Sequence, residues 1–197
     1  MEFIQQLING LALGSVYALL ALGYTMVYGI IQLINFAHGE IYMIGAFAGY
    51  YASSVLELPL LPTLLIAMTA SALLGILIEK VAYKPLRKSP RIALLITAIG
   101  VSLFLQNIMS KFFGTAPKHF PELRNLKPIN LLGLHLDWKT IFMFAVSALL
   151  VLLLQFIVYK TKVGKAMRAA SYDIEAASLM GINVNNTISL TFAIGSA

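Results

Sequence analysis

Long apolar runs follow one another along this chain, and they restrict its fold more than any other feature. Crossing about 30 Å of hydrocarbon takes roughly 20 mostly apolar residues at 1.5 Å of helical rise each. The chain is 59% hydrophobic and 11% charged, with a mean hydropathy of +0.85, whereas soluble domains carry about 25% charged residues. The sequence therefore predicts an all-α integral membrane protein, a multi-span helical bundle.

Six apolar runs are expected to cross or enter the membrane. They are predicted within Phe3–Ile31, from about Ile41 to at least Tyr51, and at about Leu60–Ile78, Ile92–Met109, Thr140–Tyr159 and Thr187 onward. The last run, TISLTFAIGSA, stops at Ala197 after too few residues to cross a bilayer. We therefore expect the bundle to be truncated within its sixth span.

The basic residues predict the orientation of the spans. All 14 Lys and Arg lie between Lys80 and Arg168, and five of them fall in the short connection EKVAYKPLRKSPR. Lys and Arg accumulate in short cytoplasmic loops, so this connection and the segment from Lys160 to Arg168 are predicted to be cytoplasmic. The net charge of +6 is thus interpreted as a topology signal, and no nucleic-acid partner is expected.

Small residues recur one helical turn apart within three spans, where they let helix backbones approach closely. The predicted packing faces are Gly10 with Gly14, Gly45 with Gly49, and Ala67 with Ser71 and Gly75. The alternative is that glycine is simply common in membrane helices.

Ionisable residues inside the spans are scarce. Glu40 and His38 are the only internal candidates, because Glu79 is assigned to the inner end of the third span. The chain contains no cysteine and no histidines at metal-ligand spacing, so no metal or resident cofactor is expected. An ion-coupled transporter would need a chain of buried charges, and a membrane-embedded enzyme would need a nucleophile, base or metal.

The segment INFAHGEIYMIGA, residues 34–46, has two interpretations. In the structural one, Gly39 breaks the chain, Asn35 and His38 satisfy exposed backbone groups, and Glu40 sits in the first turn of the second span. In the functional one, an interrupted helix lines a cavity, and these residues form part of an inner gate.

Two further groups of polar residues are open to the same two interpretations. Tyr24 and Tyr28 share one face of the first span with Tyr17, and Gln106 and Asn107 lie in the fourth. Each group either anchors and packs its helix or lines a translocation pathway.

The stretch RAASYDIEAASLMGI, residues 168–182, is polar and predicted to be cytoplasmic. An amphipathic segment precedes it; Asp173 is expected to cap a helix over residues 174–180, and Gly181 to end it in the left-handed region. So short a helix is marginal alone and needs a neighbour to pack on. That neighbour is either its own bundle or a partner protein.

The residues of this stretch resemble a known motif. Glu175-Ala176-Ala177 followed by Gly181 is similar to the EAA loop of ABC import permeases. Over most of the chain, GLALGSVYALLALGYTMVYGIIQLINFAHGEIYMIGAF, IEKVAYKPLR, AIGVSLFLQN, GKAMRAAS and LMGIN resemble the high-affinity branched-chain amino acid permease family.

This resemblance implies that residues 1–197 form a single transmembrane permease domain, with residues 160–183 as its cytoplasmic coupling loop. The implied partners are a second, similar permease subunit, two cytoplasmic ATPase subunits that carry ATP and magnesium, and an external amino-acid-binding protein. The implied activity is import of leucine, isoleucine and valine across the bacterial inner membrane, by a subunit that is not itself an enzyme. The alternatives are a permease for urea or short amides and an ion-coupled transporter. The predicted ATPase contact involves Arg168, Asp173, Glu175, Ala176, Ala177 and Gly181.

Overall fold

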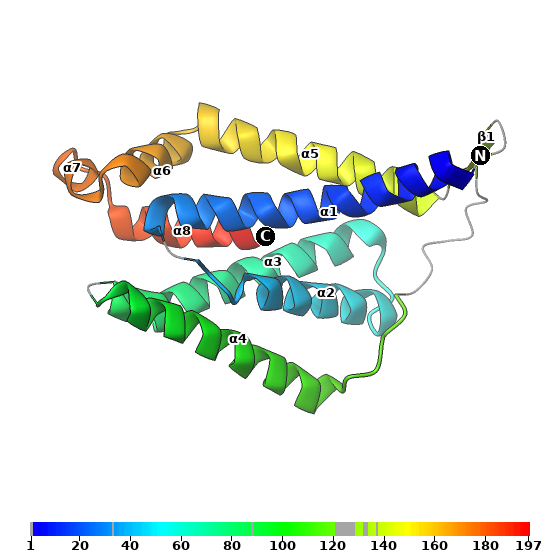
Figure 1. Cartoon of the computed structure of the whole chain (residues 1–197), viewed down its shortest axis with the longest axis horizontal. Coiled ribbons are helices and arrows are strands. Elements are labelled where there is room, and N and C mark those ends of the chain that lie inside the picture. Colours follow the sequence, from blue (N-terminus) through cyan, green and yellow to red (C-terminus); the bar gives the residue numbers. More distant parts are fainter. Residues whose placement is uncertain (1, 33, 88, 121–128, 132–133, 137) are drawn as a thin grey trace. The chain divides into compact units, whose positions relative to one another are not determined.

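The computed structural model describes residues 2–32, 34–87, 89–120, 129–131, 134–136 and 138–197. The helices are α1 (Glu2–Ile31), α2 (His38–Ser54), α3 (Leu60–Ile78), α4 (Arg91–Phe113), α5 (Trp138–Lys160), α6 (Lys162–Tyr172), α7 (Ile174–Leu179) and α8 (Val184–Ser196) (Figure 1). A π-helical turn, η1 (Glu79–Tyr83), and a 3-10 turn, η2 (Lys84–Leu86), extend α3. Every predicted span coincides with one of these helices.

A short antiparallel hairpin departs from the helical architecture. Strands β1 (Ile129–Leu131) and β2 (Leu134–Leu136) pair with Ile129 opposite Leu136. They lie in the long connection between α4 and α5, so the all-α class holds for the membrane-spanning part.

Four helical segments are long and apolar enough to cross a membrane: Phe3–Ile31, Leu60–Leu86, Arg91–Phe113 and Thr140–Lys160. Helix α2 has 17 residues, which gives a length of about 25 Å. It extends beyond the predicted core of the second span at both ends.

Helix α3 shows how these segments are adapted to lipid. Leu61, Leu65, Leu73 and Leu77 lie four or eight residues apart and are exposed, whereas Thr63, Ser71 and Gly75 are buried. Large apolar side chains thus face outward and small or polar ones face the neighbouring helices, as in membrane bundles.

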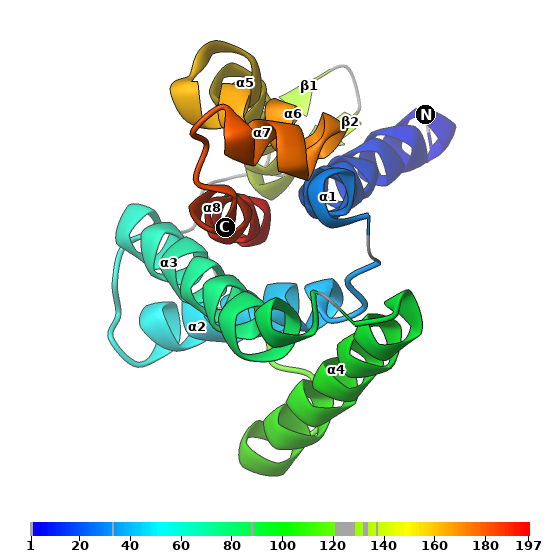
Figure 2. The same ribbon diagram turned by 90° about the vertical axis from the view of Figure 1, so that its left-hand side faces the viewer.

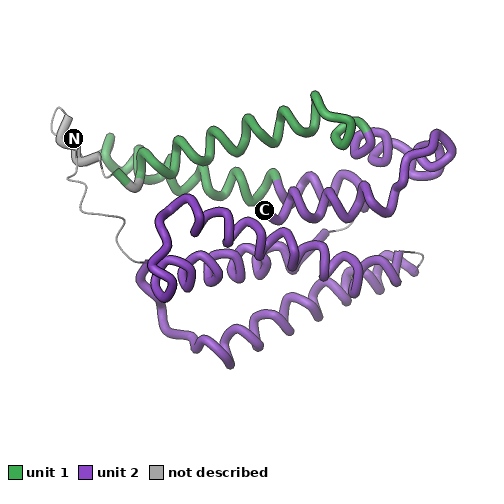
Figure 3. Tube along the Cα trace, turned by 180° about the vertical axis from the view of Figure 1, so that it is seen from behind, with its two compact units in different colours: residues 1–22, 122–165 green, residues 23–121, 166–197 purple. Residues whose placement is uncertain are grey.

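The chain divides into two compact units, residues 1–22 with 122–165 and residues 23–121 with 166–197 (Figure 3). In the first unit, Ser15 Oγ lies 3.3 Å from Ser147 Oγ and joins α1 to α5. The second unit contains the end of α1 and helices α2, α3, α4, α7 and α8, and the candidate sites lie in it. The prediction of one domain over residues 1–197 stays a prediction.

Small residues bring α2, α3 and α8 together in the second unit (Figure 2). A β-carbon at Gly45 would lie 3.5 Å from the Ser71 β-carbon, and one at Gly49 would lie 3.4 Å from that of Ala67. Gly75 faces α8. These two predicted packing faces are confirmed.

The prediction for Gly10 and Gly14 is wrong within the described part of the chain, because no atom lies within 4 Å of a β-carbon built at either residue. A glycine pair alone does not identify a packed face, since exposed glycines also occur in membrane helices.

Candidate functional site

The short helix α7 is capped at both ends as predicted. Asp173 has an extended backbone, and its Oδ1 accepts from the backbone nitrogens of Glu175 (2.8 Å) and Ala176 (3.0 Å). Gly181 has a φ of +84°. The nitrogen of Gly181 donates to Ser178 O at 3.0 Å and that of Ile182 to Ala177 O at 3.1 Å, which is the Schellman arrangement of a helix ending in the left-handed region.

The exposed surface of α7 differs from the predicted docking face. Ala177 is only 4% exposed and packs inward, whereas Leu179 and Met180 are 88% and 85% exposed. Glu175 and Ala176 are also exposed. Two large apolar side chains at the tip of a polar loop are typical of a contact surface.

Helix α6 leads into α7 and is amphipathic as predicted. Met167 and Ala170 are buried, while Arg168 lies on the exposed face with Lys165. Arg168 is therefore near α7 in sequence and open to solvent, as a charged flank requires.

Two hollows lie beside α7, and their lining residues show which inter-helix segments of the second unit are close to this helix. The larger, of about 580 Å³, is lined by Arg87, Ile174, Glu175, Ser178, Leu179, Val184, Asn185 and Ile188. The smaller, of about 290 Å³, is lined by residues 30–32 and 170–175. The α1–α2 connection, the turn after α3 and the predicted coupling loop thus lie at one end of this unit, and the last two of these are predicted to be cytoplasmic.

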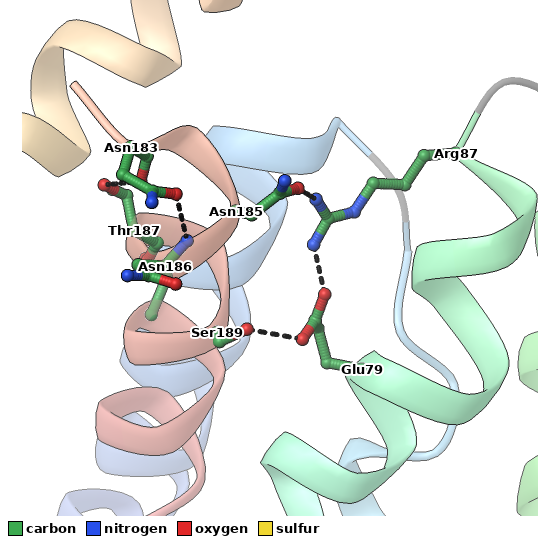
Figure 4. A network of polar contacts seen from close by, with 8 residues as sticks. Glu79, Arg87, Asn183, Asn185, Asn186, Thr187 and Ser189 are labelled. Carbon is green, nitrogen blue, oxygen red and sulfur yellow. Dashed lines mark hydrogen bonds and ion pairs between the residues drawn. The ribbon is translucent and has the colours of Figure 1, made fainter. Parts of the chain in front are cut away.

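A polar network beside the larger hollow was not predicted (Figure 4). Glu79 is 0% exposed; its Oε1 pairs with Arg87 Nη2, and its Oε2 accepts from Ser189 Oγ at 2.6 Å. Arg87 Nη1 also donates to Asn185 Oδ1 at 2.7 Å. We define Glu79, Arg87, Asn185 and Ser189 as the Glu79 network.

Glu79 lies at the end of α3 as predicted, but its burial was not expected and results from the packing of α8 against α3 and η1. Its partner on α8, Ser189, lies 110 positions away in the sequence. Arg87, eight positions after Glu79, is the nearby residue that could have suggested the ion pair. Side-chain pairs on a helix are three or four residues apart, so this spacing did not predict the contact.

The predicted gate residues lie in and beside the link between α1 and α2: Asn35 is in the link, and His38, Gly39 and Glu40 form the first turn of α2. Helix α1 ends at Ile31, Gln32 has a φ of 53°, and α2 begins at His38. Gly39 is inside α2, so the prediction that Gly39 breaks the chain is wrong. Its backbone is helical because the interruption of the helix falls earlier, at residue 32 and residues 34–37.

Several polar residues of this link meet side chains from other helices. Asn35 Oδ1 accepts from Tyr83 Oη at 2.6 Å and from Ala37 N at 3.1 Å. Glu40 Oε1 accepts from Gln106 Nε2 at 2.5 Å. Among the described residues, Asn35 Nδ2 and Glu40 Oε2 are buried without a hydrogen-bond partner. The predicted satisfaction of backbone groups by Asn35 is thus confirmed, and Glu40 lies in the first turn of α2 as predicted.

The tyrosines of α1 are only partly brought to this cluster. The rings of Tyr24 and His38 meet edge to face with centroids 6.0 Å apart, but Tyr28 is 47% exposed. Gln106 contacts the cluster, whereas Asn107 Nδ2 donates to Leu103 O on its own helix. We define Asn35, His38, Glu40 and Tyr83, which are all buried, as the buried polar cluster. The half-buried Tyr24 contacts it through His38, and the exposed Gln106 donates to Glu40. The cluster offers amide, imidazole, phenol and carboxylate groups for hydrogen bonding.

Apolar helices that expose leucine and bury small and polar side chains define a multi-pass α-helical membrane protein. The chain belongs to the branched-chain amino acid transport system permease component family, whose model matches residues 6–197. Its relatives are transport permeases rather than enzymes.

The similarity to individual relatives extends along the whole chain. It is 41% identical over 211 residues to the high-affinity branched-chain amino acid transport system permease protein BraD of Pseudomonas aeruginosa, covering 100% of this chain and 68% of BraD. LivH of Escherichia coli K12, a permease protein of the same description, is 41% identical over 207 residues, or 99% of this chain and 67% of LivH. A probable LivH of Methanocaldococcus jannaschii is 32% identical over 184 residues, 86% of this chain and 55% of that relative. No solved structure matches the chain.

Proposed function

We propose that this protein is the membrane-spanning permease subunit of an ATP-driven importer of branched-chain amino acids in the bacterial inner membrane. The relatives BraD and LivH are named as permeases of high-affinity branched-chain amino acid transport systems. Leucine, isoleucine and valine are therefore the first substrates to test, and urea or short amides are the alternative.

The observation that carries the coupling part of the proposal is the construction of α7. Six residues are too few for a stable isolated helix, yet α7 is capped at both ends and exposes Leu179 and Met180. An apolar tip on a rigid, hydrophilic loop suits insertion into a cleft of another protein.

In this mechanism α7 docks on one of two cytoplasmic ABC ATPase subunits, which hold ATP and magnesium. Closure of the ATPases moves the docked helix and rocks the attached spans between outward and inward access. A second, homologous permease subunit completes the pathway, and an external binding protein delivers the amino acid. Glu175, Ala176, Leu179 and Met180 make the contact, Arg168 flanks it, and Asp173, Ala177 and Gly181 hold the helix in shape.

The buried Glu79 favours a structural role over ion coupling. Both of its oxygens are bound, one by Arg87 and one by Ser189, and breaking such a buried pair is costly. Glu40 is bound on one oxygen only and carries no argument about the energy source.

Cysteine cross-linking tests the proposal, because the 197 residues contain no cysteine. Leu179→Cys in the full-length protein, co-expressed with the ATPase, is expected to cross-link to cysteines in the ATPase's surface cleft, with a yield that changes on adding ATP. Ala177→Cys is the matched control, since its side chain is buried two positions away on the same helix. Absence of any Leu179→Cys cross-link to an ATPase that is demonstrably present would refute the coupling role.

Transport assays identify the substrate. Proteoliposomes that contain the whole importer are expected to accumulate labelled leucine with ATP inside and not with an imposed proton or sodium gradient. Accumulation of urea but not leucine would favour the amide alternative.

A further inference from the structure

The π-helical turn η1 connects two parts of the second unit that are far apart in sequence. Its first residue, Glu79, accepts from Ser189 of α8 at 2.6 Å. Its last residue, Tyr83, donates to Asn35 in the α1–α2 link at 2.6 Å. Both side chains are almost completely buried. A displacement of α8 therefore acts on η1, and a displacement of η1 acts on the buried polar cluster.

Arg87 joins this turn to the wall of the hollow beside α7 (Figure 4). Its guanidinium pairs with Glu79 and donates to Asn185 in the first turn of α8. It also lines the hollow together with Ile174 and Glu175 of α7. Only residues 180–183 separate α7 from α8, so the start of α8 is one of the two places that can take up a movement of α7.

The geometry of the network permits a rearrangement. π-Turns are rare and occur frequently at functional sites. Within the described part of the chain, Arg87 Nε is buried without an acceptor, so the guanidinium can gain a hydrogen bond when its surroundings shift. Removing either Glu79 or Arg87 leaves the charge of the other without its opposite charge, which is costly inside a protein. The two side chains are therefore expected to move together.

We propose that the Glu79–Arg87 pair is a positioning element that transmits movement of α7 through η1 to the buried polar cluster at the α1–α2 link. The inference rests on the proposed docking of α7 and adds the route inside the permease. Arg87 and Glu79 act through Tyr83 and Asn35 and need not touch the transported molecule.

The test compares Arg87→Gln, Glu79→Gln and the double variant Glu79→Gln/Arg87→Gln in the whole importer reconstituted in proteoliposomes. Arg91→Gln is the matched control, because Arg91 is also basic, starts α4 nearby and is exposed. Leucine uptake, ATP hydrolysis and the Leu179→Cys cross-link are measured on each variant. The cross-link reports docking and assembly, and the ratio of ATP hydrolysed to leucine moved reports transmission.

Each single variant is expected to keep the cross-link and ATP hydrolysis while the ratio of ATP to leucine rises at least tenfold. The double variant also lacks the ion pair and is expected to keep the raised ratio. A return of its ratio to within about threefold of the Arg91→Gln control would show that only an uncompensated charge was harmful, and it would overturn the inference. If the ratio of ATP hydrolysed to leucine moved is unchanged in both single variants, the inference is overturned. This ratio does not depend on the amount of protein, so a lower protein level would not hide the result. If Leu179→Cys gives no cross-link in the importer that keeps Glu79 and Arg87, the proposed docking is refuted instead.

Discussion

Substitution of Gly75 by alanine tests the packing of α3 against α8 most directly. A β-carbon at Gly75 would lie 2.8 Å from the β-carbon of Ser196 and 3.1 Å from the carbonyl oxygen of Phe192. The first distance falls about 0.7 Å short of an ordinary carbon–carbon contact of about 3.5 Å. Since neither neighbouring atom can rotate away, the two helices must separate.

Overpacking of this kind lowers the free energy of unfolding by about 1–3 kcal/mol. At about 2–4 °C per kcal/mol for a protein of this size, Gly75→Ala should lower the Tm by about 2–12 °C. The assay is thermal unfolding of the full-length protein in lipid nanodiscs. Gly100→Ala in α4 is the control, because no atom lies within 4 Å of a β-carbon at Gly100.

Adding Ser196→Gly to Gly75→Ala should restore much of the lost stability, because it removes the closest atoms. The reasoning is refuted if Gly75→Ala is as stable as Gly100→Ala, or if Ser196→Gly gives no recovery in the double variant.

Three further substitutions test local features of the proposed machinery. Asp173→Ala removes the cap of α7 and should cost about 0.5–2 kcal/mol of local stability, seen as faster amide exchange of Glu175 and Ala176, whereas Asp173→Asn should retain slow exchange. Gly181→Ala places a β-carbon in the left-handed region at about 1–2 kcal/mol and should weaken the Leu179→Cys cross-link; an undiminished yield would contradict this. Tyr83→Phe deletes the donor to Asn35 and should lower the free energy of unfolding by about 1–3 kcal/mol in chemical denaturation, and an unchanged midpoint and slope would count against that hydrogen bond.

The proposed route through the permease is short. Hydrogen bonds to Glu79 and Asn35 are made at the two ends of a single helical turn. Arg87, which pairs with the first residue of that turn, also lines the hollow beside α7.

Features set by neighbouring residues could be predicted from the sequence. The span at Leu60–Ile78 follows from a continuous apolar run and matches α3 residue for residue. The cap of Asp173 and the left-handed Gly181 follow from side-chain chemistry within one or two turns. Such features depend on residues that are close together in the sequence, so they can be predicted without knowing how the helices pack.

Contacts between helices could not be predicted in this way. Glu79 and Ser189 are 110 residues apart, Glu40 and Gln106 are 66 apart, and Tyr83 and Asn35 are 48 apart. In a chain where most surfaces are apolar, hydropathy gives little information on which helix faces pair.

The sequence by itself thus determined that the chain spans a membrane, where its helices lie and how its short polar helix begins and ends. Only the tertiary structure decided that Ala177 faces inward while Leu179 and Met180 face outward, and that a boundary glutamate is buried with Arg87. The physical reason is that helix formation and capping depend on local hydrogen bonds and hydropathy, whereas burial of an individual side chain depends on which helices come together.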